Sequence, residues 1–271
     1  MDLDRRPLGP RTFDVICAGD GAWRATLGRM EGVPGSAVSA GLVEVACALA
    51  QRGARVGLAT TLPDDRGGRA LRRTAAAAGV DVDGVTLAPP PSGLVLVDAA
   101  GQSTIGVEEA ARELAIPGAW SSSVLLLAGL SPRVDAAAAL CRAARRARRD
   151  GSTVVLDVAG SARRWWGHDP RTLAMVIRSA DVVRCTLMSL AVVGLDVAAV
   201  RRAMRPGAVL VTGDEAGTTA AGPFGEVHVG ARSGDDAAVL VASICAELAR
   251  PSRGLESLEA RWERALRPPP S

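Results

Sequence analysis

Residues 231–249, ARSGDDAAVLVASICAELA, contain the strongest indication of how this chain folds. They would join a strand to a long apolar helix, with Ser233, Gly234 and Asp235 at the start of that helix. Free backbone N–H groups at a helix start can bind an anion, and a carboxylate there can take a proton from a hydroxyl. Small and acidic residues are also ordinary helix N-caps, so this stretch alone leaves both interpretations open.

Upstream, short apolar runs alternate with longer helical segments, a pattern typical of βαβ units with a mostly parallel sheet. The expected strands are residues 13–19, 54–60, 124–130, 152–158, 180–185 and 208–213. The expected helices are residues 39–53, 67–79, 134–149, 170–179, 197–204, 234–249 and 255–266. Residues 85–89 together with 93–108 predict a β-hairpin that turns at Ala99–Gln102, and residues 217–230 predict a second hairpin.

The composition excludes several kinds of site. Of the 271 residues, 48% are hydrophobic and only 3% are aromatic, which suits an aliphatic core of buried parallel strands. All 32 basic residues are arginine, so a Walker-type lysine, a Schiff-base lysine and a lysine general base are excluded. The arginines of residues 142–149 lie on an expected helix and the net charge is only +3, so we expect a solvated helix face and no nucleic-acid partner.

The cysteines and histidines argue against disulfides, a zinc site and a cysteine nucleophile. The five cysteines are widely spaced without a CxxC pair, and they predict free buried thiols in a reducing compartment. His168 and His228 are far apart in sequence, so a zinc site or a cysteine–histidine nucleophile is poorly supported. No apolar run is long enough to span a bilayer. We therefore expect a cytoplasmic protein without a membrane partner or a dedicated metal site.

Six motifs occur along the chain in an order and spacing that one known family shares. They are the helix ends Ala48–Ala54 and Gly79–Asp81, the turn Leu62–Gly68, the segment Asp157–Trp165, the strand end Val211–Gly217 and the loop Arg232–Asp235. Through these motifs the chain resembles the ribokinase-like (PfkB) carbohydrate kinases over most of its length. The resemblance implies a three-layer α/β/α sandwich with a mostly parallel central sheet and a small β-hairpin lid.

The resemblance also implies a reaction and the residues that perform it. The reaction is ATP-dependent phosphorylation of a sugar or related small alcohol, with Mg²⁺ held largely by the phosphates and water. Asp235 matches the base that deprotonates the acceptor hydroxyl, and the anion hole falls on Arg232, Ser233 and Gly234. The positions that match nucleotide contacts are Thr212, Gly213, Asp214 and Gly217, and those assigned to the substrate are Asp20, Arg24, Gly41 and Glu44.

Several positions depart from the family pattern. Arg24 falls where the family has a sugar-binding aspartate, Glu44 where it has an asparagine, and Arg232 at the first glycine of the anion loop. The segment Thr186–Ser189 lacks the magnesium-linked acid of the family's N-x-x-E motif. Three hypotheses stay open. The first is an active kinase with an unusual acceptor, and Arg24 would suit an acidic one. The second is a catalytically inactive pseudokinase with a binding or regulatory role, and the third is an unrelated nucleotide-binding α/β protein.

The sequence predicts a single α/β domain over residues 13–250, with residues 85–107 as a β excursion or lid. Residues 1–12 predict a flexible tail, and residues 251–271 predict a C-terminal helix and tail. An exposed strand edge on the lid would favour a homodimer. Trp165 and Trp166 are expected to anchor a core or an interface rather than to line a ligand cleft.

Overall fold

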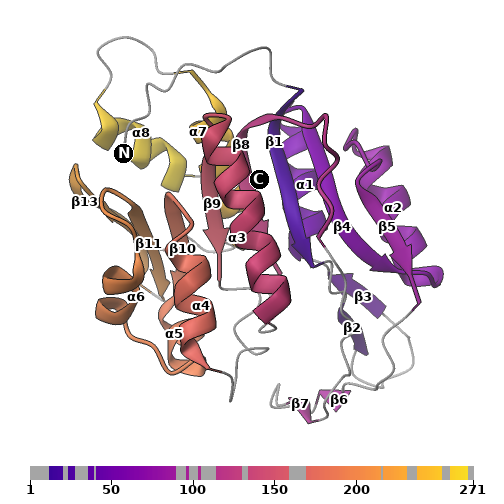
Figure 1. Cartoon of the computed structure of the whole chain (residues 1–271), viewed down its shortest axis with the longest axis horizontal. Coiled ribbons are helices and arrows are strands. Elements are labelled where there is room, and N and C mark those ends of the chain that lie inside the picture. Colours follow the sequence, from indigo (N-terminus) through magenta and orange to yellow (C-terminus); the bar gives the residue numbers. More distant parts are fainter. Residues whose placement is uncertain are drawn as a thin grey trace.

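The computed structural model shows one large β-sheet with helices on both faces (Figure 1). It describes residues 12–20, 24–27, 36–39, 41–89, 96–97, 103–104, 114–129, 134–158, 169–214, 216–230, 237–251 and 257–267. None of the helices in this described part of the chain is long and apolar enough to cross a membrane.

The sheet has nine strands, of which the first seven in sequence run parallel to one another. Each of the last two strands pairs antiparallel with the strand before it. Its spatial order is β13-β12-β11-β10-β9-β8-β1-β4-β5. The strands are β1 (Phe13–Asp20), β4 (Val56–Pro63), β5 (Val85–Ala88), β8 (Ser122–Ala128), β9 (Thr153–Asp157), β10 (Val182–Thr186), β11 (Val209–Asp214), β12 (Gly217–Gly222) and β13 (Gly225–Gly230). The central residues of the seven parallel strands are mostly aliphatic and buried, which is typical of strands that are covered on both faces.

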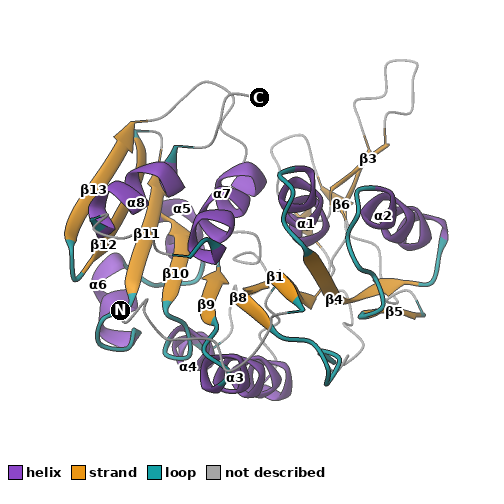
Figure 2. Cartoon of the chain, turned by 90° about the horizontal axis from the view of Figure 1, so that it is seen from above, coloured by secondary structure: helices purple, strands orange, loops and turns teal. Residues whose placement is uncertain are grey.

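The helices cover the two faces of the sheet and form two separate apolar cores with it. In Figure 2, α1, α2 and α7 lie on one side of the sheet, and α3 and α4 lie on the other. One face carries α1 (Gly41–Gln51), α2 (Arg66–Ala77), α7 (Ala237–Ala249) and α8 (Leu258–Leu266). The other carries α3 (Val134–Arg149), α4 (Pro170–Ile177), α5 (Leu187–Val192) and α6 (Val197–Ala203). The expected three-layer sandwich with a mostly parallel sheet is therefore confirmed.

Two short hairpins lie outside the main sheet. The pair β6 (Leu96–Val97) and β7 (Ser103–Thr104) is antiparallel and agrees with the expected turn near residues 99–102. The structure differs from the sequence-based expectation for Val85–Ala88, which is not part of that hairpin. This segment is β5, and it pairs in parallel with β4 at the edge of the main sheet. A second hairpin, β2 (Arg24–Leu27) with β3 (Ser36–Ser39), was not predicted from the sequence.

The turn between β4 and α2 shows why the motif at residues 62–68 has its composition. Asp65 is the N-cap of α2, and its carboxylate accepts a hydrogen bond of 2.8 Å from the Gly68 backbone N–H. Gly68 lies so close to β4 that a Cβ atom there would be 2.0 Å from the carbonyl oxygen of Pro63. Only glycine allows α2 to begin this close to the end of β4.

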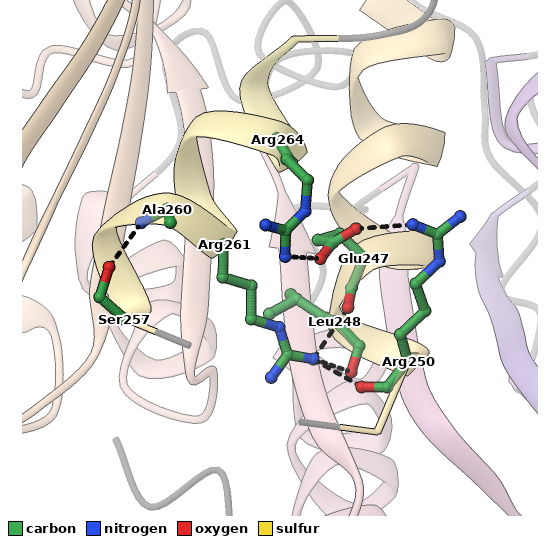
Figure 3. A network of polar contacts seen from close by, with 7 residues as sticks. All are labelled: Glu247, Leu248, Arg250, Ser257, Ala260, Arg261 and Arg264. Carbon is green, nitrogen blue, oxygen red and sulfur yellow. Dashed lines mark hydrogen bonds and ion pairs between the residues drawn. The ribbon is translucent and has the colours of Figure 1, made fainter. Parts of the chain in front are cut away.

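Helix α8 is fastened to the end of α7 by arginine side chains (Figure 3). Arg261 is buried, and its Nη2 donates to the carbonyl oxygens of Glu247, Leu248 and Arg250 at 2.8, 3.2 and 2.7 Å. The buried carboxylate of Glu247 accepts from Arg264 at 2.7 Å and from Arg250 at 3.1 Å. Carbonyl groups at a helix end have no partner within their own helix, and Arg261 satisfies several of them.

Candidate functional site

Several of the expected site residues that the structure describes lie where the parallel strands end. In open α/β sheets, ligands bind beside the carboxyl ends of the strands. Asp20 is the last residue of β1, and Thr212 and Gly213 are near the end of β11. Gly41 and Glu44 lie in the first turn of α1, on the connection that leads from β1 to β4. The structure thus brings Asp20, Gly41, Glu44, Thr212 and Gly213 to one edge of the sheet, which we call the carboxyl edge.

The end of β1 is held tightly against its neighbours. Gly19 has a φ of +153°, and a Cβ atom there would be 1.7 Å from the carbonyl oxygen of Ala128 in β8. On the other side, the buried Thr60 hydroxyl of β4 donates a 2.8 Å hydrogen bond to the Gly19 carbonyl. The backbone of Asp20 is therefore fixed in place, although its side chain lies outside the described residues.

The other expected substrate residues differ in how they are placed. Arg24 is the first residue of β2 and pairs with Ser39, but its side chain is also outside the described part of the chain. Glu44 lies in the first turn of α1 and is exposed, so its carboxylate is open to solvent and to ligands. Burial raises the pKa of the nearby Cys47 thiol, and the charge of Glu44 adds to this effect. Cys47 is therefore a neutral thiol at pH 7.

The turn that follows β11 is stabilised by hydrogen bonds to the side chain of Asp214. The Asp214 carboxylate accepts hydrogen bonds from the backbone N–H groups of Ala216 at 2.8 Å and Gly217 at 3.1 Å. Gly217 has a φ of +145°, which favours glycine. Asp214 is thus engaged in shaping the turn. Thr212 is partly exposed beside it and stands opposite Cys185 of β10 in the sheet register.

The segment that replaces the N-x-x-E motif forms a pair of hydroxyl groups. Thr186 is the N-cap of α5, and its Oγ1 accepts a 3.0 Å hydrogen bond from the backbone N–H of Ser189. The hydroxyls of Thr186 and Ser189 are also 2.6 Å apart. No group of three or more histidine, cysteine or acidic side chains in the described ranges could hold a metal ion.

A buried ion pair at this edge was missed from the sequence. Arg184 of β10 and Asp157, the last residue of β9, are register partners, and Arg184 Nη1 lies 3.1 Å from Asp157 Oδ1. Their side chains are only 7% and 12% exposed. Side chains alternate between the faces of a strand, and Val155 and Val182 contribute to the core beneath α1 and α7. The ion pair therefore faces the same side as α7, the helix that follows residues 231–236.

The sequence carried a signal for this pair. Arg184 stands in the otherwise apolar run Val182–Cys185, and an arginine that is almost fully buried requires a partner. Burial also raises the pKa of the neighbouring Cys185 thiol to about 12, so this cysteine is not a nucleophile. The expected catalytic residue Asp235 and the anion-hole residues Arg232, Ser233 and Gly234 lie outside the described residues. So do Trp165 and Trp166.

Comparison with known proteins supports the architecture. No protein-family model matches the sequence, and no curated protein matches it. Among solved structures, the fructokinase from Xylella fastidiosa is similar at a TM-score of 0.69 and 20% identity, covering 93% of this chain and 91% of that one. The aminoimidazole riboside kinase from Salmonella enterica has a TM-score of 0.69 at 19% identity, covering 93% and 89%. The PfkB protein from Polaromonas sp. JS666 has 0.65 at 19%, covering 94% and 93%. The chain therefore has the ribokinase-like α/β fold.

Proposed function

We propose that this protein transfers the γ-phosphoryl group of ATP to a hydroxyl of a small, sugar-like alcohol. The observation that carries the proposal is the position of the Asp157–Arg184 ion pair at the carboxyl edge, on the face of the sheet that α7 covers. Residues 231–236, with the expected base Asp235, lead directly into that helix. Similar structures include a fructokinase with bound ATP and a riboside kinase with its riboside and an ATP analogue.

The reaction would proceed by in-line displacement. Asp235 accepts the proton of the acceptor hydroxyl, and the hydroxyl oxygen forms a bond to the γ-phosphorus while the bond to ADP breaks. Backbone N–H groups of Ser233, Gly234 and Asp235, which precede α7 in the sequence, and the charge of Arg184 stabilise the negative charge on the transferring group. Magnesium bound to the phosphates would neutralise part of their charge.

Arg184 has a specific part in this proposal. Asp157 orients its guanidinium, and an arginine offers five N–H donors, of which the described ion pair uses one nitrogen. The remaining donors suit a phosphate oxygen. In a chain without lysine, this arginine supplies a fixed positive charge at the carboxyl edge.

A second candidate function is that of a pseudokinase that binds nucleotide without turnover. The observation in its favour is the Thr186–Ser189 hydroxyl pair, which stands where the resembling family has its magnesium-linked acid. A site without this carboxylate would retain anion binding at α7 but would hold magnesium less firmly.

Two measurements separate these functions. Calorimetric titration with ATP, with and without Mg²⁺, tests nucleotide binding, and both functions require it. ADP release is then measured across a panel of sugars, sugar acids and nucleosides. Acceptor-dependent ADP release supports the kinase, ATP binding without turnover on any acceptor supports the pseudokinase, and failure to bind ATP contradicts both.

A further inference from the structure

A cavity of about 220 Å³ lies at the opposite edge of the sheet from the candidate site. It is bounded by the C-terminal half of α3 and by residues just before β8 and β9, at the amino ends of these strands. Strand β8 has seven residues, and at roughly 3.3 Å per residue about 20 Å separate its two ends. The cavity is therefore separate from the carboxyl edge.

The cavity exists because α3 presents small side chains to the sheet at this level. Ala139, Ala143 and Ala147 recur every four residues, which places them on one side of the helix, and all three line the cavity. They face Ile16 of β1 and Leu125 of β8. Figure 2 shows α3 against this face of β8 and β9. The alanines leave unfilled the space that longer side chains would occupy between helix and sheet.

One wall of the cavity is a rigid aromatic ring. Trp120 packs edge-on against Phe13, with ring centroids 4.7 Å apart. The ring also lies against Gly57 and Gly84, where a Cβ atom would come within 2.8 Å of it. The Trp120 ring is thus held in one position before any ligand arrives. A preformed aromatic wall lowers the cost of binding a flat apolar group.

The rim of the cavity is polar and carries a net positive charge. Arg142 and Arg146 lie one turn apart on α3, and both line the cavity together with Asp150. Arg146 donates to the carbonyl oxygen of Gly118 and lies 4.0 Å from the Asp150 carboxylate. Among the residues that the structure describes, none forms an ion pair or a hydrogen bond with the Arg142 side chain, so its guanidinium can pair with an anion.

We propose that this cavity is a second binding site, for a small monocarboxylate with an aromatic or branched aliphatic body. The apolar body would lie between Trp120 and the alanines of α3, and the carboxylate would pair with Arg142. The volume is below the roughly 300–1,000 Å³ of sites for drug-sized ligands, so the ligand has the size of benzoate or phenylacetate rather than of a nucleotide.

The test is a ligand-observed NMR titration of the full chain with benzoate, and with benzamide as the neutral analogue. We expect benzoate to bind, and benzamide to bind at least tenfold more weakly. Arg142→Gln should weaken benzoate at least tenfold, and Ala143→Leu, which fills the cavity, should abolish binding. Arg145→Gln is the matched control, because Arg145 is an exposed arginine of the same helix that does not line the cavity.

Either of two results overturns the proposal: no benzoate binding to the wild-type chain, or binding that is unchanged in Arg142→Gln. If Ala143→Leu does not fold, the comparison of Arg142→Gln with Arg145→Gln still decides, because both are exposed substitutions. The titration contains no ATP, so its outcome is independent of the proposed phosphoryl transfer. Added ATP should leave benzoate binding unchanged.

Discussion

Arg184 is a charged residue in an otherwise apolar strand, and its burial depends on Asp157. Removing charges from water is costly, and the attraction within a buried pair offsets that cost only when both partners are present. The pair is 3.1 Å apart and almost completely shielded from solvent. Substituting one partner removes this attraction while the other charge stays buried.

We predict that Arg184→Met lowers the free energy of unfolding by roughly 3–5 kcal/mol, because Asp157 is left without its cationic partner. Urea denaturation monitored by circular dichroism measures the change. Arg55→Met is the control, since Arg55 forms an exposed pair with Asp14 at 2.9 Å and its loss should change stability little. Equal urea midpoints for Arg184→Met and the wild type would contradict this account of the pair.

At the same scale, the positions of some expected residues follow from the sequence more readily than their contacts do. The motif order placed Thr212, Gly41 and Glu44 at one edge because strand ends follow directly from apolar runs. The role of Asp214 in its own turn depends on two backbone N–H groups, which the residue pattern does not reveal. The ion pair of Arg184 was not predicted, because its partner Asp157 is 27 residues away along the chain.

At the scale of elements, α2 offers a paired test of the Asp65-Arg66-Gly67-Gly68 turn. We predict that Gly68→Ala destabilises the protein by about 3 kcal/mol or more, because the added Cβ would meet the backbone of Pro63 at 2.0 Å. Gly67→Ala is the matched control: its nearest neighbour is the Asp65 carboxylate at 3.4 Å, and alanine favours helix. Thermal unfolding should show a lowered midpoint for Gly68→Ala alone. A midpoint for Gly68→Ala at or above that of Gly67→Ala would show that α2 does not begin against β4.

Helix α8 is a second element whose attachment can be tested. We predict that Arg261→Met lowers stability by roughly 2–4 kcal/mol, since several carbonyl groups at the end of α7 lose a buried donor. Arg250→Met should have an effect below about 1 kcal/mol, because the Arg250 side chain is 68% exposed in its pair with Glu247. Limited proteolysis together with thermal unfolding compares the two variants. Similar behaviour of both would mean that the network in Figure 3 does not fasten α8.

The elements that sequence analysis placed differently share a physical cause. Val85–Ala88 is short and apolar, and local sequence does not distinguish a hairpin strand from an edge strand of a large sheet. Its pairing with Thr60–Pro63 is made across helix α2 and depends on tertiary packing. The hairpin of β2 and β3 lacks an Asn-Gly or Asp-Gly turn signal. The two helices that were expected to stop at Gly53 and Gly79 are present, and they end two residues earlier, at Gln51 and Ala77.

At the scale of the whole molecule, the sheet separates two regions of different chemistry. The carboxyl edge carries the Asp157–Arg184 pair together with Gly41, Glu44 and Thr212. The amino edge carries the cavity beside α3. The fold follows from the alternation of apolar strands and helices. The proposed turnover depends instead on single residues, above all on Asp235, in a chain that lacks the N-x-x-E acid.

The most direct test of the central claim is acceptor-dependent ADP release by Asp235→Asn and Asp236→Asn, each assayed beside the wild type. Both variants change one carboxylate to an amide in adjacent residues, so charge and size are matched. The proposed base predicts that Asp235→Asn lowers kcat by roughly 10²–10⁴-fold while ATP still binds, and that Asp236→Asn retains most of the activity. Undiminished turnover by Asp235→Asn would contradict the claim.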